Sequence, residues 1–321
     1  MQLQEKIIRF RLQRFISIIR DGIHYINGVP VHESVFGQDP FEPVTCSDIP
    51  QMIASQSQVP VQVVTDGRIV MSASKPTIAV YDAQTDEELR VLAHALNAGG
   101  KLGTLAGCAG MAQALPELLH LTGEKPVIPE FRPAFLVVCG SVNPITRSQL
   151  DYAEQHGFRR IRLTPQQKLE PGYFETEMGK AKVRELAEQC RTSQLCILDT
   201  NDVPGVSDTL DYAREKGISL EELRVRIATT LGYLVKELVG GDLDSTMMIT
   251  GGDSLLGFMN QIRVCEMTPI CEMEPGTVLS QFEINGKCYE VISKSGGFGE
   301  KNLLTELGEK ILGRKEERAL C

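Results

Sequence analysis

The stretch Met247-Met248-Ile249-Thr250-Gly251-Gly252-Asp253-Ser254 runs from apolar residues into two glycines and two residues that favour helix starts. It predicts a strand, a tight turn and a helix, because residues 255–264 carry apolar side chains with the one-sided spacing of a helix packed on a sheet. Asp253 or Ser254 is expected to cap that helix. The glycines permit positive φ and close approach of a ligand, and the free N–H groups of a helix start favour an anion such as phosphate. A turn that binds nothing is the alternative.

Two other predicted strands also end in glycines. The alternating run 288–293 leads into Lys294-Ser295-Gly296-Gly297-Phe298-Gly299, and the apolar run 135–139 leads into Gly140-Ser141. In a parallel sheet the carboxyl ends of the strands meet at one edge, where ligands bind. The three strand ends therefore predict an α/β fold with a binding crevice at that edge.

The composition excludes several classes of protein. The 321 residues are 42% hydrophobic and 23% charged, which is typical of a soluble globular protein long enough for two domains. The net charge of -9 argues against a nucleic-acid partner, because binding to phosphate backbones needs clustered Lys and Arg. No apolar run reaches the roughly 18 residues of a membrane span, so no membrane partner is expected either.

The pattern of cysteines and histidines favours a cytoplasmic protein and predicts no metal site formed by these side chains. The nine cysteines show no C-x-x-C pair and no disulfide framework, and the five histidines show no H-x-x-x-H pair. Residues 1–20 are rich in Arg and contain one acid, Glu5. Such a lead is typical of a targeting sequence, but a solvated basic helix or an ill-fitting remnant is the preferred interpretation.

A segment of prolines and charged residues divides the chain. Residues 121–133 hold Gly123 and three prolines, which is typical of a linker between domains. The sequence therefore predicts an α/β protein of two domains, residues 1–122 and residues 131–313, the second with a largely parallel sheet.

Local patterns predict elements in both domains. Asn27-Gly28 between two alternating apolar runs is a strong hairpin signal, and the stretch from Leu220 carries a long helical apolar stripe that Gly240-Gly241 closes. Further strands are predicted at 61–64, 77–81 and 195–198, and further helices near 48–57, at 87–96, after residue 110 and after residue 144.

Four motifs follow one another in the second domain. In chain order they are Gly140-Ser141 with Thr146 and Gln149-Leu150, Thr250-Gly251-Gly252-Asp253-Ser254, Glu272-Met273-Glu274-Pro275-Gly276, and residues 294–299. Together they resemble the nucleotide-binding domain of the four-carbon acid sugar kinases, which phosphorylate tetronates and 3-oxo-tetronates. Ser254 replaces a Thr of the family pattern.

The first domain is similar to the later part of the family's substrate domain from Gly22 onward. The matching segments are residues 28–33, Asp39-Pro40, residues 82–86 and residues 107–110. The family's leading Asp-Asp and Thr-Gly-Ala signature and its Ser-Thr-x-Arg-Gly segment have no counterpart, and residues 1–20 stand in their place. The resemblance then implies an incomplete substrate domain, as from a truncated, split or frameshifted gene.

The resemblance implies an ATP-dependent kinase acting on a four-carbon acid sugar, with Mg²⁺ as a second cofactor. It implies that the nucleotide is bound by Ser141, Gly251, Gly252, Asp253, Ser254, Gly296 and Gly297. Asp253 is expected to act through Mg²⁺ rather than as the base, because a carboxylate beside phosphates needs a cation between them. The catalytic base falls in the missing segment and is not assigned.

An incomplete first domain would leave apolar surface exposed. Such a surface would favour association into a homodimer or with a separate amino-terminal fragment. A non-catalytic nucleotide-binding fragment or subunit of a split kinase is therefore the alternative function.

Two other nucleotide-binding patterns fail on spacing. No strand end has the G-x-G-x-x-G sequence with an acid on the next strand that a dehydrogenase needs. The segment Gly100-Lys101-Leu102 lacks both the first glycine and the Ser or Thr of a P-loop.

Overall fold

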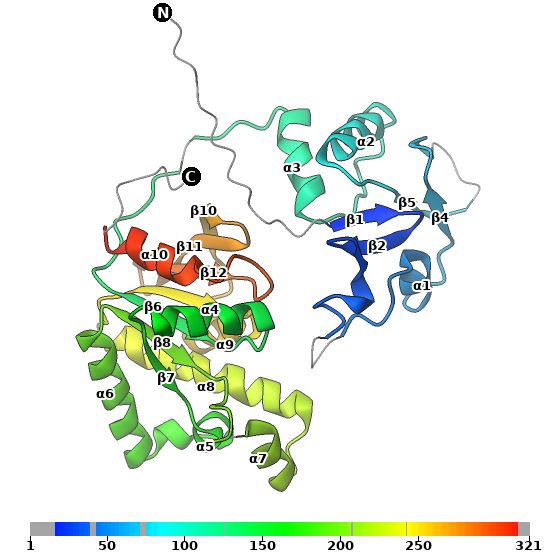
Figure 1. The fold of residues 1–321 in the computed structure, drawn as a ribbon. Helices are drawn as coiled ribbons and strands as arrows, with labels where there is room; N and C mark the ends of the chain where they lie inside the picture. The colour runs from blue at the N-terminus through cyan, green and yellow to red at the C-terminus, as the bar shows by residue number, and fades with distance from the viewer. Residues whose placement is uncertain are drawn as a thin grey trace, which may run out of the picture. The chain divides into compact units, whose positions relative to one another are not determined.

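The computed structural model describes residues 17–38, 43–70, 75–124, 126–206, 208–241 and 243–313. They belong to two compact units, Phe15–Lys125 and the chain from Pro126 onward (Figure 1). Both units mix helices and strands, so the predicted α/β fold with two domains is confirmed.

The first unit holds two small sheets among its described residues. Strands β1 (Ser17–Arg20), β2 (Ile23–Ile26) and β3 (Val29–Pro30) form an antiparallel sheet, and β4 (Val61–Val64) and β5 (Ile78–Tyr81) pair in parallel. The helical elements are η1 (Val31–Glu33), α1 (Ile49–Ala54), α2 (Asp86–Ala98) and α3 (Ala109–Leu118).

The start of this unit confirms one prediction and corrects another. Asn27 and Gly28 have φ of 51° and 81°, and they join β2 to β3 in the predicted two-residue hairpin. The end of the basic lead is β1, a strand paired with β2, and is not a solvated helix. The Arg20 guanidinium lies 4.8 Å from the Tyr25 ring centroid. Residues 1–16 of that lead lie outside the described residues.

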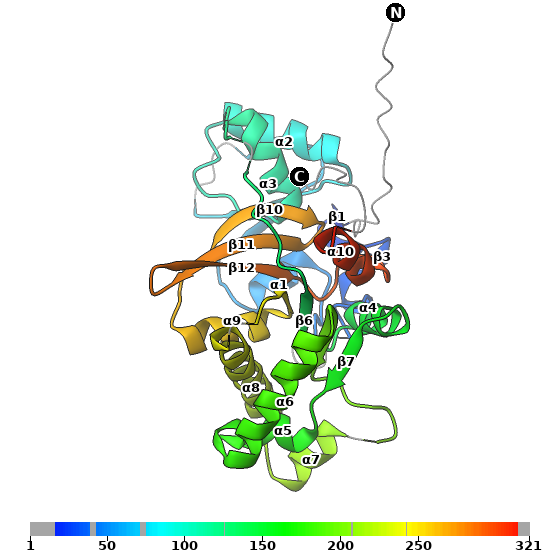
Figure 2. The same ribbon diagram turned by 90° about the vertical axis from the view of Figure 1, so that its left-hand side faces the viewer.

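The second unit is built on a seven-stranded sheet of order β10-β11-β12-β9-β6-β8-β7. From β12 to β7 the strands run parallel, and β10 and β11 extend the sheet antiparallel. Figure 2 shows β10, β11 and β12 side by side. The predicted largely parallel sheet is therefore confirmed. The strands are β6 (Phe135–Cys139), β7 (Arg159–Arg162), β8 (Leu195–Asp199), β9 (Thr246–Thr250), β10 (Thr268–Glu274), β11 (Thr277–Ile284) and β12 (Lys287–Lys294).

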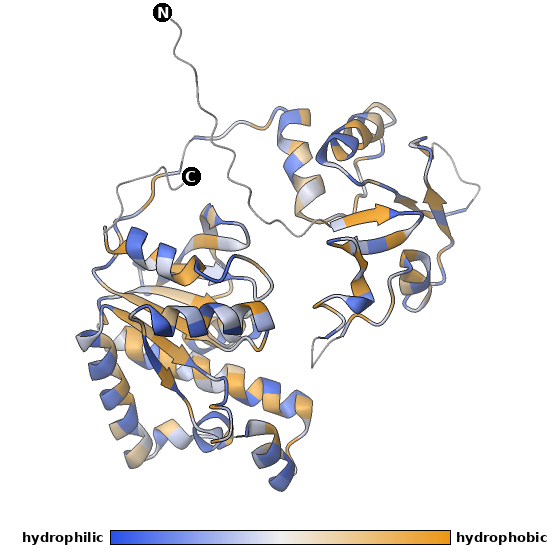
Figure 3. Cartoon of the chain, viewed as in Figure 1, coloured by the Kyte–Doolittle hydropathy of each residue, from blue (hydrophilic) through white to orange (hydrophobic). Residues whose placement is uncertain are grey.

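Helices cover both faces of this sheet. Side chains of α6, α8 and α9 pack with Leu136 and Val138 on one face, and those of α4 and α10 pack with Phe135 and Val137 on the other. The central strands β6, β8 and β9 are apolar nearly throughout. The helices carry hydrophobic and hydrophilic residues on different sides, as Figure 3 shows. The helical elements are α4 (Pro144–Gln155), α5 (Pro165–Leu169), η2 (Tyr173–Glu175), α6 (Glu177–Thr192), α7 (Thr209–Glu215), α8 (Leu220–Gly240), α9 (Gly252–Ile262) and α10 (Leu303–Ile311).

Two glycines bring α8 and α9 into backbone contact. A Cβ on Gly232 would lie 2.3 Å from the Gly257 carbonyl oxygen, and a Cβ on Gly257 would lie 2.2 Å from the Ala228 carbonyl oxygen. Only glycine tolerates such an approach. The close packing holds the first turn of α9 against the sheet edge where β9 ends.

In the part of the chain that the structure describes, no helix combines the length and the apolar character needed to span a membrane.

Candidate functional site

The parallel strands of the second unit end in one row. Pairing registers place Lys294 of β12 beside Thr250 of β9, Thr250 beside Cys139 of β6, and Cys139 beside Asp199 of β8. Antiparallel pairing adds Thr277 of β11 beside Lys294. Residues in register share a face of the sheet, and all five are buried. The three glycine-bearing turns therefore leave the sheet at the same edge, as the sequence predicted.

The turn after β9 uses its two glycines differently. Gly251 has φ of 104°, and a Cβ there would contact the Ser141 nitrogen and the Ser254 hydroxyl oxygen at 3.4 Å. A Cβ on Gly252 would meet nothing within 4 Å. Gly251 therefore serves the backbone conformation, whereas Gly252 faces open space.

The expected side-chain cap of α9 is wrong. The N-cap is Gly251, so Asp253 and Ser254 lie inside the first turn. The Ser254 side chain is buried against β6, where a Cβ on Gly140 would lie 2.0 Å from its Oγ. The Asp253 carboxylate is 55% exposed and lies 3.3 Å from the Arg224 guanidinium of α8. A helix start without a side-chain cap keeps its N–H groups available to an anion.

Ser141 lies between the turns that follow β9 and β12. A Cβ on Gly296 would lie 2.7 Å from the Ser141 Oγ, so the two residues approach closely. The Ser141 Oγ accepts a 3.3 Å hydrogen bond from the Asn143 N–H. Of the predicted site residues, the structure brings Ser141, Gly251, Ser254 and Gly296 together, and leaves Gly252 and Asp253 on the open side.

Two polar residues of α4 hold the turn after β12. The Gln149 Nε2 donates to the carbonyl oxygens of Phe298, Gly299 and Glu300 at 2.9–3.0 Å. The Thr146 Oγ1 donates to the Gly296 carbonyl at 2.7 Å. Both side chains are buried, as is Gly297 within the turn. The role of this Thr and Gln in the sequence motif is therefore to fix a loop 150 residues away.

A buried charge network lies under Ser141, and the sequence patterns did not predict it. Arg160 is 3% exposed and binds the Asp199 carboxylate through two nitrogens, at 2.7 and 2.9 Å. Asp199 in turn accepts a 2.8 Å hydrogen bond from the Asn201 Nδ2, which also donates to the Ser141 carbonyl at 3.1 Å. The only sequence signal was a polar residue directly after a buried strand.

Asp253 at this edge could be a ligand of Mg²⁺ only if phosphates supplied most of the other ligands. Within the described ranges no group of three or more His, Cys, Asp or Glu side chains could hold a metal ion. Mg²⁺ in phosphoryl-transfer sites is bound by one or two carboxylates together with substrate phosphates. The partly exposed Asp253 can supply such an oxygen.

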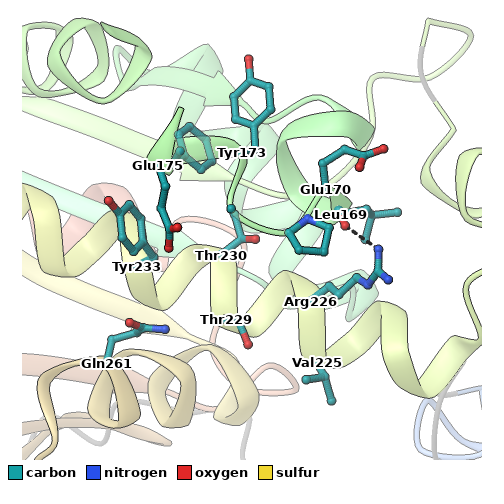
Figure 4. A pocket seen from close by; sticks show the side chains of 13 residues that line it. Leu169, Glu170, Tyr173, Glu175, Val225, Arg226, Thr229, Thr230, Tyr233 and Gln261 are labelled. Atoms are coloured by element: carbon teal, nitrogen blue, oxygen red, sulfur yellow. Dashed lines mark hydrogen bonds between the residues drawn. The ribbon is translucent and has the colours of Figure 1, made fainter. Parts of the chain in front are cut away.

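A separate hollow of about 210 Å³ is lined by residues 169–175, α8 and Gln261 of α9. Figure 4 shows Tyr233 and Glu175 on one side of it and Arg226, which donates to the Leu169 carbonyl at 2.8 Å, on the other. Its lining residues do not include the glycine turns or Ser141. In those turns the N–H groups of residues 252, 296 and 297 donate to no acceptor among the described residues, so the turns are the better candidate for an anion site.

The first unit contains a larger hollow of about 530 Å³. Its lining includes four carboxylates, Asp21, Asp82, Glu87 and Glu88, and one guanidinium, Arg20. Asp82 already accepts hydrogen bonds from the backbone N–H groups of Asp21 and Gly22. This charge balance disfavours an anionic ligand.

Comparison with known proteins matches both parts of the chain. A nucleotide-binding C-terminal domain model matches residues 136–304, and a sugar-binding N-terminal domain model matches residues 13–115. The match of the sugar-binding domain begins at residue 13, ahead of Gly22, where the sequence resemblance was expected to start.

Two curated relatives carry the name D-threonate kinase. The chain is 26% identical over 299 residues to that of Salmonella typhimurium, which covers 89% of this chain and 69% of the relative. It is 24% identical over 308 residues to that of Bordetella bronchiseptica, covering 92% of this chain and 68% of the relative.

Solved structures share the fold. A protein of Salmonella typhimurium LT2 matches with a TM-score of 0.67 at 16% identity, covering 92% of this chain and 71% of that chain. A Haemophilus influenzae protein matches with a TM-score of 0.57 at 16% identity, covering 93% and 72%. The two domain matches and the two kinase relatives, together with the motifs at the sheet edge, show that this chain belongs to the four-carbon acid sugar kinase family.

Proposed function

We propose that this protein transfers a phosphoryl group from ATP to a hydroxyl group of a four-carbon acid sugar, a tetronate or a 3-oxo-tetronate. The observation that carries the proposal is the convergence of the three glycine-bearing strand ends around Ser141. Two relatives named D-threonate kinase support this class of substrate.

The proposed nucleotide site uses backbone N–H groups more than side chains. Phosphates would lie over Gly252 and Asp253 at the start of α9, where the helix dipole and the free N–H groups favour negative charge. Ser141 would donate its hydroxyl to a phosphate or sugar oxygen, and Gly296 and Gly297 would pass beside the nucleotide. Phosphoryl transfer depends mainly on such positioning and charge stabilisation.

Mg²⁺ would neutralise charge on the phosphates, with Asp253 as its protein ligand. Binding of Mg²⁺ would move the Asp253 carboxylate away from Arg224, with which it forms a 3.3 Å ion pair in this structure. The carboxylate has room to move because its side chain is 55% exposed. Arg224 would then lie close to the phosphates.

The test is an ATP-dependent assay with the purified chain on D-threonate, D-erythronate and their 3-oxo forms, run beside calorimetry with ADP. We expect ADP binding and ADP release that depends on one of these acid sugars. ADP binding without turnover of any of them would favour the alternative, a nucleotide-binding subunit that lacks kinase activity by itself. Absence of ADP binding would overturn the site at the sheet edge.

A further inference from the structure

Lys294, the last residue of β12, is a buried lysine that carries no ion pair with a described residue. Its side chain is 3% exposed, and its Nζ contacts the Ser295 carbonyl at 2.9 Å and the Gly296 carbonyl and Thr146 Oγ1 at 3.4 Å. Burying an ammonium is costly unless a negative charge compensates it.

A second buried lysine of this unit, Lys168, shows how a buried ammonium is usually compensated. Lys168 is as deeply buried as Lys294, but its Nζ lies 2.7 Å from the Asp202 carboxylate. Among the described residues, the Lys294 Nζ contacts only neutral oxygens. This contrast indicates that the compensating charge for Lys294 comes from a ligand.

The neighbours of Lys294 in the sheet are also neutral. Thr250 and Thr277 flank it on β9 and β11, and their hydroxyl oxygens are buried without a hydrogen-bond partner among the described residues. The titratable group that acts on it from β6 is the Cys139 thiol, and burial raises the pKa of that thiol, so that it stays neutral. Facing it from α4 is the Thr146 hydroxyl.

The contacts of Lys294 also set the direction of two peptide planes. The Ser295 and Gly296 carbonyl oxygens both face the Lys294 ammonium. The Thr146 hydroxyl also donates a hydrogen bond to the Gly296 carbonyl, which holds that carbonyl in the same direction. In a trans peptide the N–H points opposite to the C=O, and no described peptide is cis. The N–H groups of Gly296 and Gly297 therefore point away from Lys294. Neither donates to an acceptor in the described part of the chain.

We propose that Lys294, with Thr146, orients the Gly296 and Gly297 N–H groups into an anion-binding nest beside Ser141 that takes a phosphate of the nucleotide. Successive backbone N–H groups of this kind form anion sites in other proteins. Lys294 is a positioning residue, since it touches the loop carbonyls and acts on the ligand through the peptide dipoles and its charge. The inference rests on the proposed nucleotide site.

Titration of Lys294 separates this role from a structural one. Burial lowers the pKa of Lys294 to about 8 in the free protein. An anion bound nearby favours the charged form and raises that pKa again. ADP binding at pH 8 without Mg²⁺ should therefore take up roughly half a proton. Calorimetry in buffers of different ionisation enthalpy measures this uptake.

The experiment compares three single variants with the wild type, using ADP as the probe. Lys294→Met keeps the length of the side chain and removes the charge, and Thr146→Val removes the hydroxyl with little change of shape. Lys168→Met is the matched control, because it removes the other buried ammonium. For each protein, ADP affinity, proton uptake at pH 8 and urea unfolding are measured.

We expect Lys294→Met to lose about tenfold or more in ADP affinity and all proton uptake, while its stability is unchanged or higher. Thr146→Val should bind ADP more weakly and keep the uptake. Lys168→Met should be less stable and bind ADP as the wild type does. Unchanged affinity and uptake in Lys294→Met would overturn this inference and leave the nucleotide site intact, whereas no ADP binding by the wild type would overturn the proposed function itself.

Discussion

Gly252→Val tests the proposed phosphate position directly. A Cβ at Gly252 meets no heavy atom within 4 Å, and Gly252 is the first residue of α9. The Cβ of a valine therefore meets no described protein atom, and its two methyl groups would extend toward the proposed phosphate position. Glycine carries the larger entropic cost in a helix, so we expect the melting temperature to change little.

The expected loss follows from the hydrogen bonds that the valine would displace. A hydrogen bond from a backbone N–H to a charged phosphate contributes about 1.5–3 kcal/mol. Loss of one such bond would weaken ADP binding about tenfold to a hundredfold, and loss of two would weaken it further. Calorimetry with ADP measures the affinity, and a thermal melt checks that the variant is folded.

Gly240→Val is the matched control. Gly240 also has nothing within 4 Å of its Cβ position, and it ends α8 ahead of β9, so it lies at the opposite edge of the sheet. We expect the control to bind ADP with wild-type affinity. If a folded Gly252→Val protein also binds ADP as tightly as the wild type, phosphates do not lie over the start of α9.

Two further variants test the metal and the buried charge network. Asp253→Asn should weaken ADP binding about tenfold in Mg²⁺ and leave it unchanged or tighter in EDTA, since the Mg²⁺ ligand is lost; an equal loss in both conditions would count against the metal role. Arg160→Met leaves the 0% exposed Asp199 carboxylate without its buried cation, so urea unfolding should report a loss of about 3–5 kcal/mol. Wild-type stability in that variant would mean that the ion pair does not balance the buried carboxylate.

The sequence was sufficient to predict the local units of the second domain. Apolar runs such as residues 135–139 and 246–250 were identified as buried strands because both faces of a covered parallel sheet exclude water. The helix stripe from Leu220 and the turn at Gly251 followed from periodicity and glycine content. The antiparallel strands β10 and β11 were not predicted, because polar residues interrupt the apolar residues of both segments and weaken the pattern.

Part of the candidate site was likewise predicted from the sequence, and part became visible only in the tertiary structure. The glycines and Ser141 were named from the chain itself, because a turn after a strand is a local feature. The cap on α9 was predicted wrongly, because the sheet order places β6 beside β9 and packs Ser254 against Gly140. Only the tertiary structure showed that Lys294 is buried without a counter-ion from the described residues.

That last feature depends on contacts between residues far apart in the chain. The Lys294 ammonium contacts Thr146 of α4, 148 residues away. Its register neighbours on both sides in the sheet are threonines, so no carboxylate stands beside it on the adjoining strands. Sequence patterns report the period and chemistry of one segment. Sheet order and register decide which segments meet, and therefore which charges are paired.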